Sequence, residues 1–130
     1  ILPKGTETIL LVEDDPGVLD FSLSVLNRLG YTVLKAESGE AALHVAEGYP
    51  APIHLLLTDV IMPGMNGRIL ADQLLRARPD LRVLFTSGYT ENIIVHHGVL
   101  EDGINFLGKP FTAAALAQKV RDILNQAAPA

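Results

Sequence analysis

The stretch that decides the fold is IHLLLTDVIMPGMNG, residues 53–67. Residues 53–58 are mostly apolar, as expected of a strand buried on both faces of a parallel sheet. The strand ends at Asp59. The Met-Pro-Gly that follows predicts a turn, in which Gly64 and Gly67 supply permissive backbone. The segment therefore places a carboxylate at the carboxyl end of a buried strand, beside a turn.

The same alternation of apolar runs and amphipathic stretches continues in both directions along the chain. Strands are expected at residues 9–12, 31–36, 53–58, 82–86 and 105–107. Helices are expected at residues 16–29, 38–47, 67–78, 91–100 and 112–125. Five such units predict an α/β fold with helices on both faces of a parallel sheet.

Polar side chains mark where three of these helices begin. Asp15, Ser38 and Thr112 are expected N-caps, and Pro16 suits the first helical position after Asp15. In the first helix, apolar residues recur at the spacing of an amphipathic face: Val18, Phe21, Val25 and Leu29. Gly30 is expected to end that helix.

The length of 130 residues is that of one domain. We expect residues 1–8 to be a linker or N-terminal extension, residues 9–126 the domain, and residues 127–130 a C-terminal tail. The first residue is Ile1 rather than Met, as in a segment cut from a longer protein.

The composition argues against several classes of function. A net charge of −5 disfavours direct binding to nucleic acid or to anionic lipid. Without cysteine, neither a disulfide framework nor a thiolate metal site can form. No apolar run is long enough to insert into a membrane, and the composition suits a cytoplasmic protein.

Charged and polar residues gather where the predicted strands end. Glu13 and Asp14 follow the first strand, Asp59 the third, Ser87 the fourth and Lys109 the fifth. In open parallel sheets, ligands bind beyond the carboxyl ends of the strands. We therefore expect these side chains to form one site.

The residue types in this group suit phosphoryl transfer. Clustered carboxylates repel one another, and Mg²⁺ would offset that repulsion because it prefers oxygen ligands. An aspartate can be the nucleophile and form an acyl phosphate. Mg²⁺, the ammonium of Lys109 and the hydroxyl of Ser87 would then stabilise the phosphoryl group.

Four segments together carry a family resemblance: ILLVEDDPGV, LLLTDVIMPGMNG, VLFTSGYT and INFLGKPF. In this order and spacing they resemble the signature blocks of bacterial response-regulator receiver domains, over residues 9–126. The resemblance implies a flavodoxin-like, doubly wound five-stranded parallel sheet in the order 2-1-3-4-5, with five helices.

The resemblance also implies a role for each acidic residue. Asp59 would accept a phosphoryl group from a phosphohistidine. Asp14 would bind Mg²⁺ directly, and Glu13 would bind it through water. Asp59 and the backbone carbonyl of Ile61 would complete the protein ligands.

On the other side of the site, the resemblance implies that Ser87 bonds a phosphoryl oxygen and that Gly88 keeps the approach open. Lys109 would pair with the carboxylate and then with the phosphoryl group, after a cis bond to Pro110. Phe106 holds the position of a switch aromatic, whose ring would turn inward as Ser87 moves. This movement would change the face made by the fourth helix, fifth strand and fifth helix.

The loop after the phospho-accepting residue has a geometric role in the family, carried here by Pro63, Gly64 and Gly67. Glu13, Ser87 and Phe106 replace the commoner Asp, Thr and Tyr. Carboxylate and hydroxyl are kept in the first two, so nothing essential to phosphorylation is missing. His96-His97 has no third ligand at metal-site spacing and is expected at the surface.

Three contexts remain open. The opening LPKGTETILLVEDD resembles the junction at which a hybrid sensor histidine kinase passes from its ATP-binding domain to its C-terminal receiver. The stretch TSGYTENIIVHHGVLEDGINFLGKPFT also resembles receivers of that group. Such a receiver would be the cytoplasmic part of a membrane-bound kinase. A stand-alone regulator is the alternative. In both cases the partners would be a histidine kinase or histidine phosphotransfer protein and a downstream protein.

The third context is a Mg²⁺-dependent phosphohydrolase with an aspartyl-phosphate intermediate. Haloacid-dehalogenase-like enzymes carry Asp-x-Asp at the end of the first strand, whereas here Glu13 and Asp14 are adjacent. Whether the protein is an enzyme stays open: the isolated receiver would promote only its own phosphorylation and dephosphorylation, whereas the parent chain of a hybrid form would be a histidine kinase.

Overall fold

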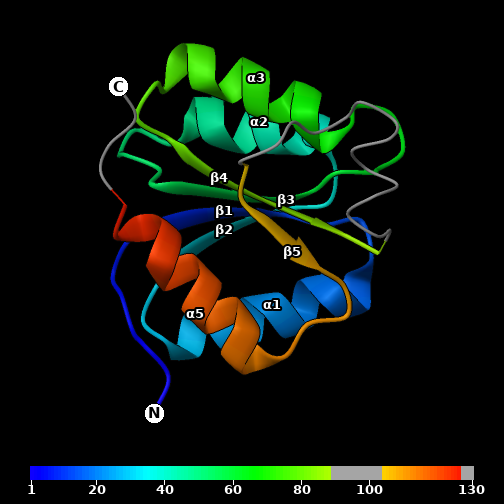
Figure 1. Cartoon of the computed structure of the whole chain (residues 1–130). Coiled ribbons are helices and arrows are strands. Elements are labelled where there is room, and N and C mark those ends of the chain that lie inside the picture. The colour runs from blue at the N-terminus through cyan, green and yellow to red at the C-terminus, as the bar shows by residue number, and fades with distance from the viewer. Residues whose placement is uncertain (89–103, 127–130) are drawn as a thin grey trace.

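The computed structural model describes residues 1–88 and 104–126, and its centre is a parallel five-stranded sheet (Figure 1). The strands lie in the order β2 (Thr32–Ala36), β1 (Thr8–Val12), β3 (Leu55–Asp59), β4 (Arg82–Ser87) and β5 (Phe106–Gly108). The described helices are α1 (Pro16–Arg28), α2 (Gly39–Gly48), α3 (Gly67–Ala77) and α5 (Ala113–Leu124). The predicted fold class and strand order are confirmed. The helix expected at residues 91–100 lies outside the described residues.

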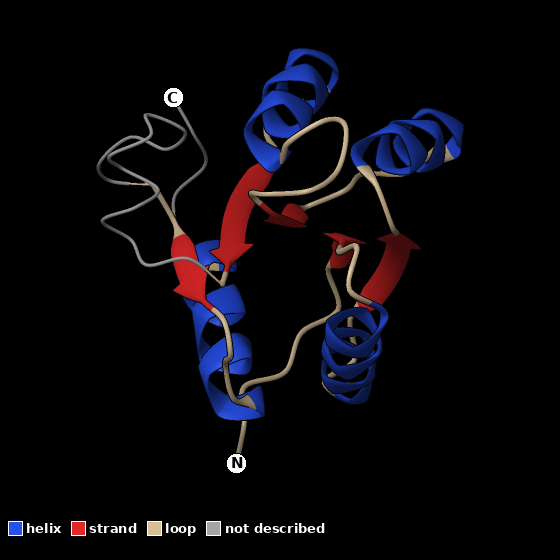
Figure 2. Cartoon of the chain, turned by 90° about the vertical axis from the view of Figure 1, so that its right-hand side faces the viewer, coloured by secondary structure: helices blue, strands red, loops and turns tan. Residues whose placement is uncertain are grey.

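Helices cover both faces of this sheet, as Figures 1 and 2 show. Helices α2 and α3 pack on one face, and α1 and α5 pack on the other. All five residues of β1 and of β3 are buried, because these central strands lie between two helical layers. Successive side chains point to opposite faces, so Leu10 and Leu56 join the core under α2 and α3. Ile9 and Leu55 join the core over α1 and α5.

Side-chain caps begin the described helices. Asp15 Oδ1 accepts from the backbone N–H of Gly17, and Ser38 and Thr112 cap α2 and α5 as predicted. Asn66 Oδ1 accepts from the N–H of Ile69 at the start of α3, a cap that was not predicted. Each such cap contributes about 1 kcal/mol.

The element boundaries agree with the sequence expectations to within one or two residues. The sheet begins earlier than expected, because Thr8 is the first residue of β1. Its N–H donates to Nδ1 of His54 at 2.9 Å, and Thr8 O accepts from the His54 N–H. Within the described part of the chain, no helix has the length and apolar character that crossing a membrane requires.

Candidate functional site

The sheet topology brings the predicted site residues to one edge. Asp59 is the last residue of β3 and pairs in register with Thr86 of β4. Ser87 ends β4, and Glu13 and Asp14 directly follow β1. These neighbouring strands are parallel, so their carboxyl ends meet, and residues far apart in the sequence become neighbours.

Three of these residues form an acidic cluster. Carboxylate oxygens of Glu13, Asp14 and Asp59 all lie within 4.8 Å of one another. Glu13 is 3% exposed and Asp59 5% exposed, whereas Asp14 faces the solvent. Three carboxylates at this distance supply the oxygen ligands that a hard divalent cation prefers.

Lys109 reaches into this cluster from the segment after β5. Its ammonium donates to Glu13 Oε1 at 2.8 Å and to Asp59 Oδ2 at 3.0 Å. The Lys109 N–H donates to Ser87 O at 2.8 Å, which continues the pairing of β4 with β5. The Lys109–Pro110 bond is cis, as the resemblance implied.

The electrostatics of the cluster show that its negative charge is only partly compensated. Burial raises the pKa of Asp59 to about 6, Lys109 opposes this shift, and the charges of Glu13 and Asp14 add to it. Burial alone would lower the pKa of Lys109, but its hydrogen bonds to Glu13 and Asp59 raise it overall. One ammonium thus faces three carboxylates, and the balance disfavours a charged Asp59.

The loop between β3 and α3 is held tightly against Asp59. Val60 N–H donates to Thr86 O, and Gly67 N–H donates back to Val60 O at 2.8 Å. A Cβ on Gly67 would lie 2.2 Å from Asp59 O, so the residue must be glycine for this approach to exist. Gly64, after Pro63, has a φ of +77°, the left-handed conformation that favours glycine.

The other predicted residues surround this centre. Ser87 is buried, whereas Gly88 is exposed and a Cβ there would meet nothing within 4 Å. Ile61 follows Asp59 by two residues, and its side chain is about half exposed. Phe106 pairs with Phe85 and packs, partly buried, against the core under α2 and α3.

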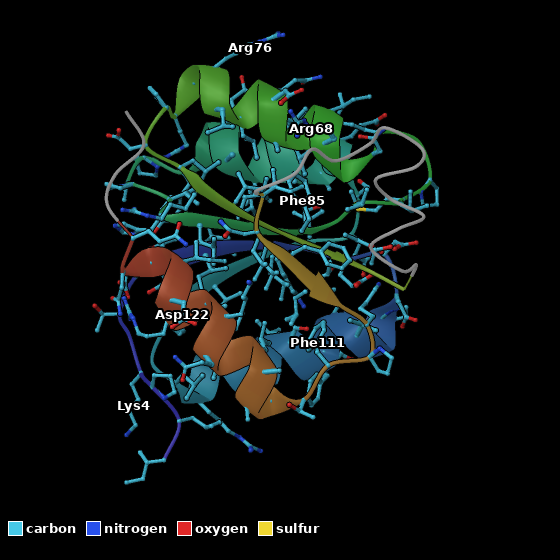
Figure 3. All side chains as sticks on the ribbon, viewed as in Figure 1. Lys4, Arg68, Arg76, Phe85, Phe111 and Asp122 are labelled. Carbon is cyan, nitrogen blue, oxygen red and sulfur yellow. The ribbon has the colours of Figure 1, made fainter. Side chains whose placement is uncertain are left out.

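An apolar pocket beside the cluster was not predicted. The pocket has a volume of about 510 Å³. Four apolar side chains line it together with Asp15, Gly17, Gly88 and Lys109; these four are Val18, Phe21, Pro110 and Phe111. The Phe21 and Phe111 rings are 6.2 Å apart between centroids, and Phe111 lies between β5 and α5, facing α1 (Figure 3).

Helical spacing had placed Phe21 on the apolar face of α1, yet it is 42% exposed. The face of α1 that α5 and the sheet bury carries Leu19, Ser22, Val25 and Leu26. Phe21 lies at the edge of that face, beside Phe111. The helical spacing of apolar residues does not distinguish the edge of this face from its centre.

Comparison with known proteins agrees with this geometry. Residues 9–121 match the model of the response regulator receiver domain. The chain is 35% identical over 123 residues to the sensor kinase CckA of Brucella abortus, covering 95% of this chain and 13% of CckA. It is 31% identical over 116 residues to the response regulator receiver protein CpdR of the same species, covering 89% of this chain and 95% of CpdR.

A solved structure of the receiver domain from the hybrid histidine kinase CckA has a TM-score of 0.77 and 37% identity. The match covers 91% of this chain and 99% of that domain. The chain belongs to the response regulator receiver domain family of two-component signalling.

Proposed function

We propose that this domain takes a phosphoryl group from a phosphohistidine onto Asp59 and requires Mg²⁺ to do so. The observation that carries the proposal is the position of Asp59, which is buried, has carboxylate oxygens of Glu13 and Asp14 within 4.8 Å, and lies 3.0 Å from the ammonium of Lys109. A carboxylate so placed is both a nucleophile and part of a cation site.

The residues present fit a magnesium ion. Three carboxylates converge within 4.8 Å while one ammonium compensates them, which leaves an excess of negative charge at oxygen ligands. Asp14 and Asp59 would hold the ion directly, Glu13 through water, and the carbonyl of Ile61 would add a ligand. When bound, Mg²⁺ neutralises charge on the phosphoryl oxygens during transfer.

The chain's own residues would carry out the transfer. An oxygen of Asp59 attacks phosphorus, and the P–N bond of the phosphohistidine breaks with its electron pair returning to the imidazole ring. Lys109 stays beside the reacting carboxylate and stabilises the oxygens of the new acyl phosphate. The hydroxyl of Ser87, at the end of the neighbouring strand, would bond one of these oxygens.

The donor would approach through the apolar pocket of Val18, Phe21 and Phe111. This pocket opens beside Lys109 and Gly88, and it is lined by exposed aromatic surface that a protein partner can cover. Among the described residues, a Cβ on Gly88 would meet no atom within 4 Å, which supports an approach of the phosphohistidine to Asp59 from this side.

Phosphorylation would then change the surface made by β5 and α5 together with the helix expected at residues 91–100, which lies outside the described residues. Ser87 and Phe106 lie on the paired strands β4 and β5, so a shift of Ser87 towards the phosphoryl group acts directly on the strand of Phe106. This surface would contact a downstream protein. We expect no direct contact with nucleic acid, because the net charge is −5.

A hybrid sensor histidine kinase is the context that we propose for the domain, in the cytoplasm. The similarity to CckA, described as a sensor kinase, supports this context. A stand-alone regulator is the alternative, and the similarity to nearly the whole length of CpdR favours it. Sequencing outward from residues 1 and 130 in the gene distinguishes the two, because a hybrid kinase encodes an ATP-binding domain upstream.

The decisive experiment is incubation with phosphoramidate and Mg²⁺, followed by intact-mass measurement. We expect one phosphoryl adduct on the wild type and on the control Asp72→Asn, an exposed carboxylate of α3, but none on Asp59→Asn. Equal labelling of all three proteins would overturn the assignment. Steady release of phosphate over many turnovers from a phosphate ester would indicate the phosphohydrolase instead.

A further inference from the structure

The segment before β1 is bound to the domain by specific contacts. Residues 2–7, here called the N-terminal strap, pass the end of α1 and continue into β1. Gly5 N–H donates to Leu29 O at 3.1 Å, and Glu7 O accepts from the N–H of Thr32. Leu2 packs against the core formed by α1 and α5. The strap is therefore anchored at its beginning, middle and end.

Arg121, in the last turn of α5, binds the strap most extensively. Its guanidinium donates to Lys4 O at 3.1 Å, to both carboxylate oxygens of Glu7, and to the hydroxyl of Tyr31 at 3.3 Å. A two-pronged arginine–carboxylate pair is among the stronger polar contacts in proteins. The hydrogen bond to Arg121, more than any other influence, lowers the pKa of Glu7 to about 2.

The backbone of the strap packs closely against its neighbours at two glycines. A Cβ on Gly5 would lie 2.4 Å from atoms of Arg121 and Tyr31. A Cβ on Gly30 would lie 2.7 Å from Gly5 O, and Gly30 has a φ of +99°. Figure 1 shows the N-terminal trace beside the C-terminal end of α5, and Figure 3 labels Lys4 on it. The strap therefore fits closely against both helices.

Helix α5 connects this strap to the phosphorylation site. Its N-terminal end follows Lys109 by four residues, and Lys109 holds Asp59 and Glu13. Its C-terminal turn carries Arg121, which holds the strap. A helix of this length is a rigid rod of roughly 18 Å. Such a rod can transmit a displacement of one end to the group at the other end.

We propose that the N-terminal strap and the phosphorylation site are coupled through α5, so that loading of Asp59 loosens the strap and release of the strap favours loading. The proposal rests on the function proposed above. It makes residues 2–7 a regulatory element of the domain: a contact that displaces them would change how readily Asp59 is loaded. By linkage, the effect on binding must be equal in the two directions.

Beryllium fluoride with Mg²⁺, a mimic of the phosphoryl group on a carboxylate, tests the coupling. The whole 130-residue chain is titrated by calorimetry as wild type, Glu7→Gln, Arg121→Met and the double variant. The control is Arg76→Met, an exposed arginine in the last turn of α3. We expect each strap variant to bind about fivefold more tightly than wild type, the double variant to match the single ones, and the control to be unchanged.

Hydrogen exchange at the Gly5 amide gives the reciprocal measurement. We expect exchange to be faster in both strap variants, and faster in the wild type once beryllium fluoride is bound. Faster exchange in the variants with unchanged affinity would overturn the coupling alone. Unchanged exchange in the variants would overturn the role of Arg121. No binding by the folded wild type would overturn the proposed function and the coupling with it. If Arg121→Met does not fold, the same measurements on Glu7→Gln decide between these outcomes.

Discussion

The ammonium of Lys109 lies 2.8 Å from Oε1 of Glu13, a residue 96 positions earlier in the chain. The second oxygen of the same carboxylate, Oε2, accepts from the N–H of Asp15 at 3.1 Å. The Glu13 carboxylate is thus fixed by two donors, one on each of its oxygens. Because Lys109 also donates to Asp59, it links the two buried carboxylates of the cluster. The charge balance of the site depends on this one side chain among the described residues.

Replacement of Asp59 by Asn should stabilise the fold. Burial and the charges of Glu13 and Asp14 raise the pKa of Asp59 to about 6, although Lys109 opposes them. The ionised carboxylate is therefore a net cost, and we expect the variant's free energy of unfolding to be higher by about 1 kcal/mol at pH 8 without divalent metal. Urea unfolding measures this difference.

The stability advantage of Asp59→Asn over the wild type should grow as the pH rises. The folded protein binds the Asp59 proton more tightly than the unfolded chain, so wild-type stability falls as pH rises from about 4 to about 6. Asp59→Asn should lack this fall and lose its advantage below pH 4. Asp72→Asn is the control on the surface of α3. A variant less stable than wild type at pH 8 would contradict the explanation.

Lys109→Met should have the opposite effect. It removes the cation that holds Glu13 and Asp59, and we expect a loss of about 2 kcal/mol in the free energy of unfolding. Added Mg²⁺ should raise the melting temperature of this variant more than that of the wild type. Lys35→Met, on the exposed side of β2, is the matched control.

Lys109→Met also distinguishes the phosphorylation of Asp59 from the structural change that follows in β5 and α5. Lys109→Met should still accept one phosphoryl group from phosphoramidate, because Asp59 and its acidic neighbours remain. It should transmit the change poorly, so the amide chemical shifts of β5 and α5 should respond less than in the wild type. Identical shift changes in both proteins would show that Lys109 has no part in transmission.

Gly67→Ala should disturb the proposed phosphorylation site through the backbone of Asp59. The new Cβ would lie 2.2 Å from Asp59 O, and backbone there cannot move aside as a flexible side chain does. We expect a loss of about 2 kcal/mol in stability and slower labelling by phosphoramidate. Gly48→Ala in α2 is the matched control, because its Cβ would meet nothing within 4 Å. Helix propensity makes that control neutral or slightly stabilising.

Phe21→Ser tests the proposed approach of the donor. Phe21 lines the pocket beside Lys109 but does not contribute to the acidic cluster. Labelling by phosphoramidate should therefore be unchanged, while transfer from a phosphorylated histidine phosphotransfer domain should slow by about tenfold. Equal rates with both donors would place the donor on another surface.

The fold could be predicted from local patterns because each strand and helix carries its own signal. The apolar runs at β1 and β3 are buried on both faces in the structure, as their composition indicated. The caps Asp15, Ser38 and Thr112 were readable for the same reason, since a cap acts on the backbone two or three residues away. Asn66 was missed because the Met-Pro-Gly turn before it was the stronger local signal.

The contacts between distant residues could not be predicted in this way. Arg121 and Glu7 are 114 residues apart, and neither has a local pattern that indicates a partner. Residues 1–8 are expected to be a linker or N-terminal extension, and their sequence gives no sign that Gly5 contacts the end of α1. Composition describes how a segment behaves alone, whereas its anchoring depends on the surfaces that the folded helices present.

The sequence by itself determined the order of the elements and the set of chemical groups at the strand ends, because periodicity, caps and turns act over a few residues. The tertiary structure decided which of these groups touch: Lys109 with Glu13 as well as Asp59, Phe21 with Phe111 at the edge of a pocket, and Arg121 with the N-terminal strap. Such distances follow from how parallel strands align and how helices pack on them. No short stretch of the chain contains that information.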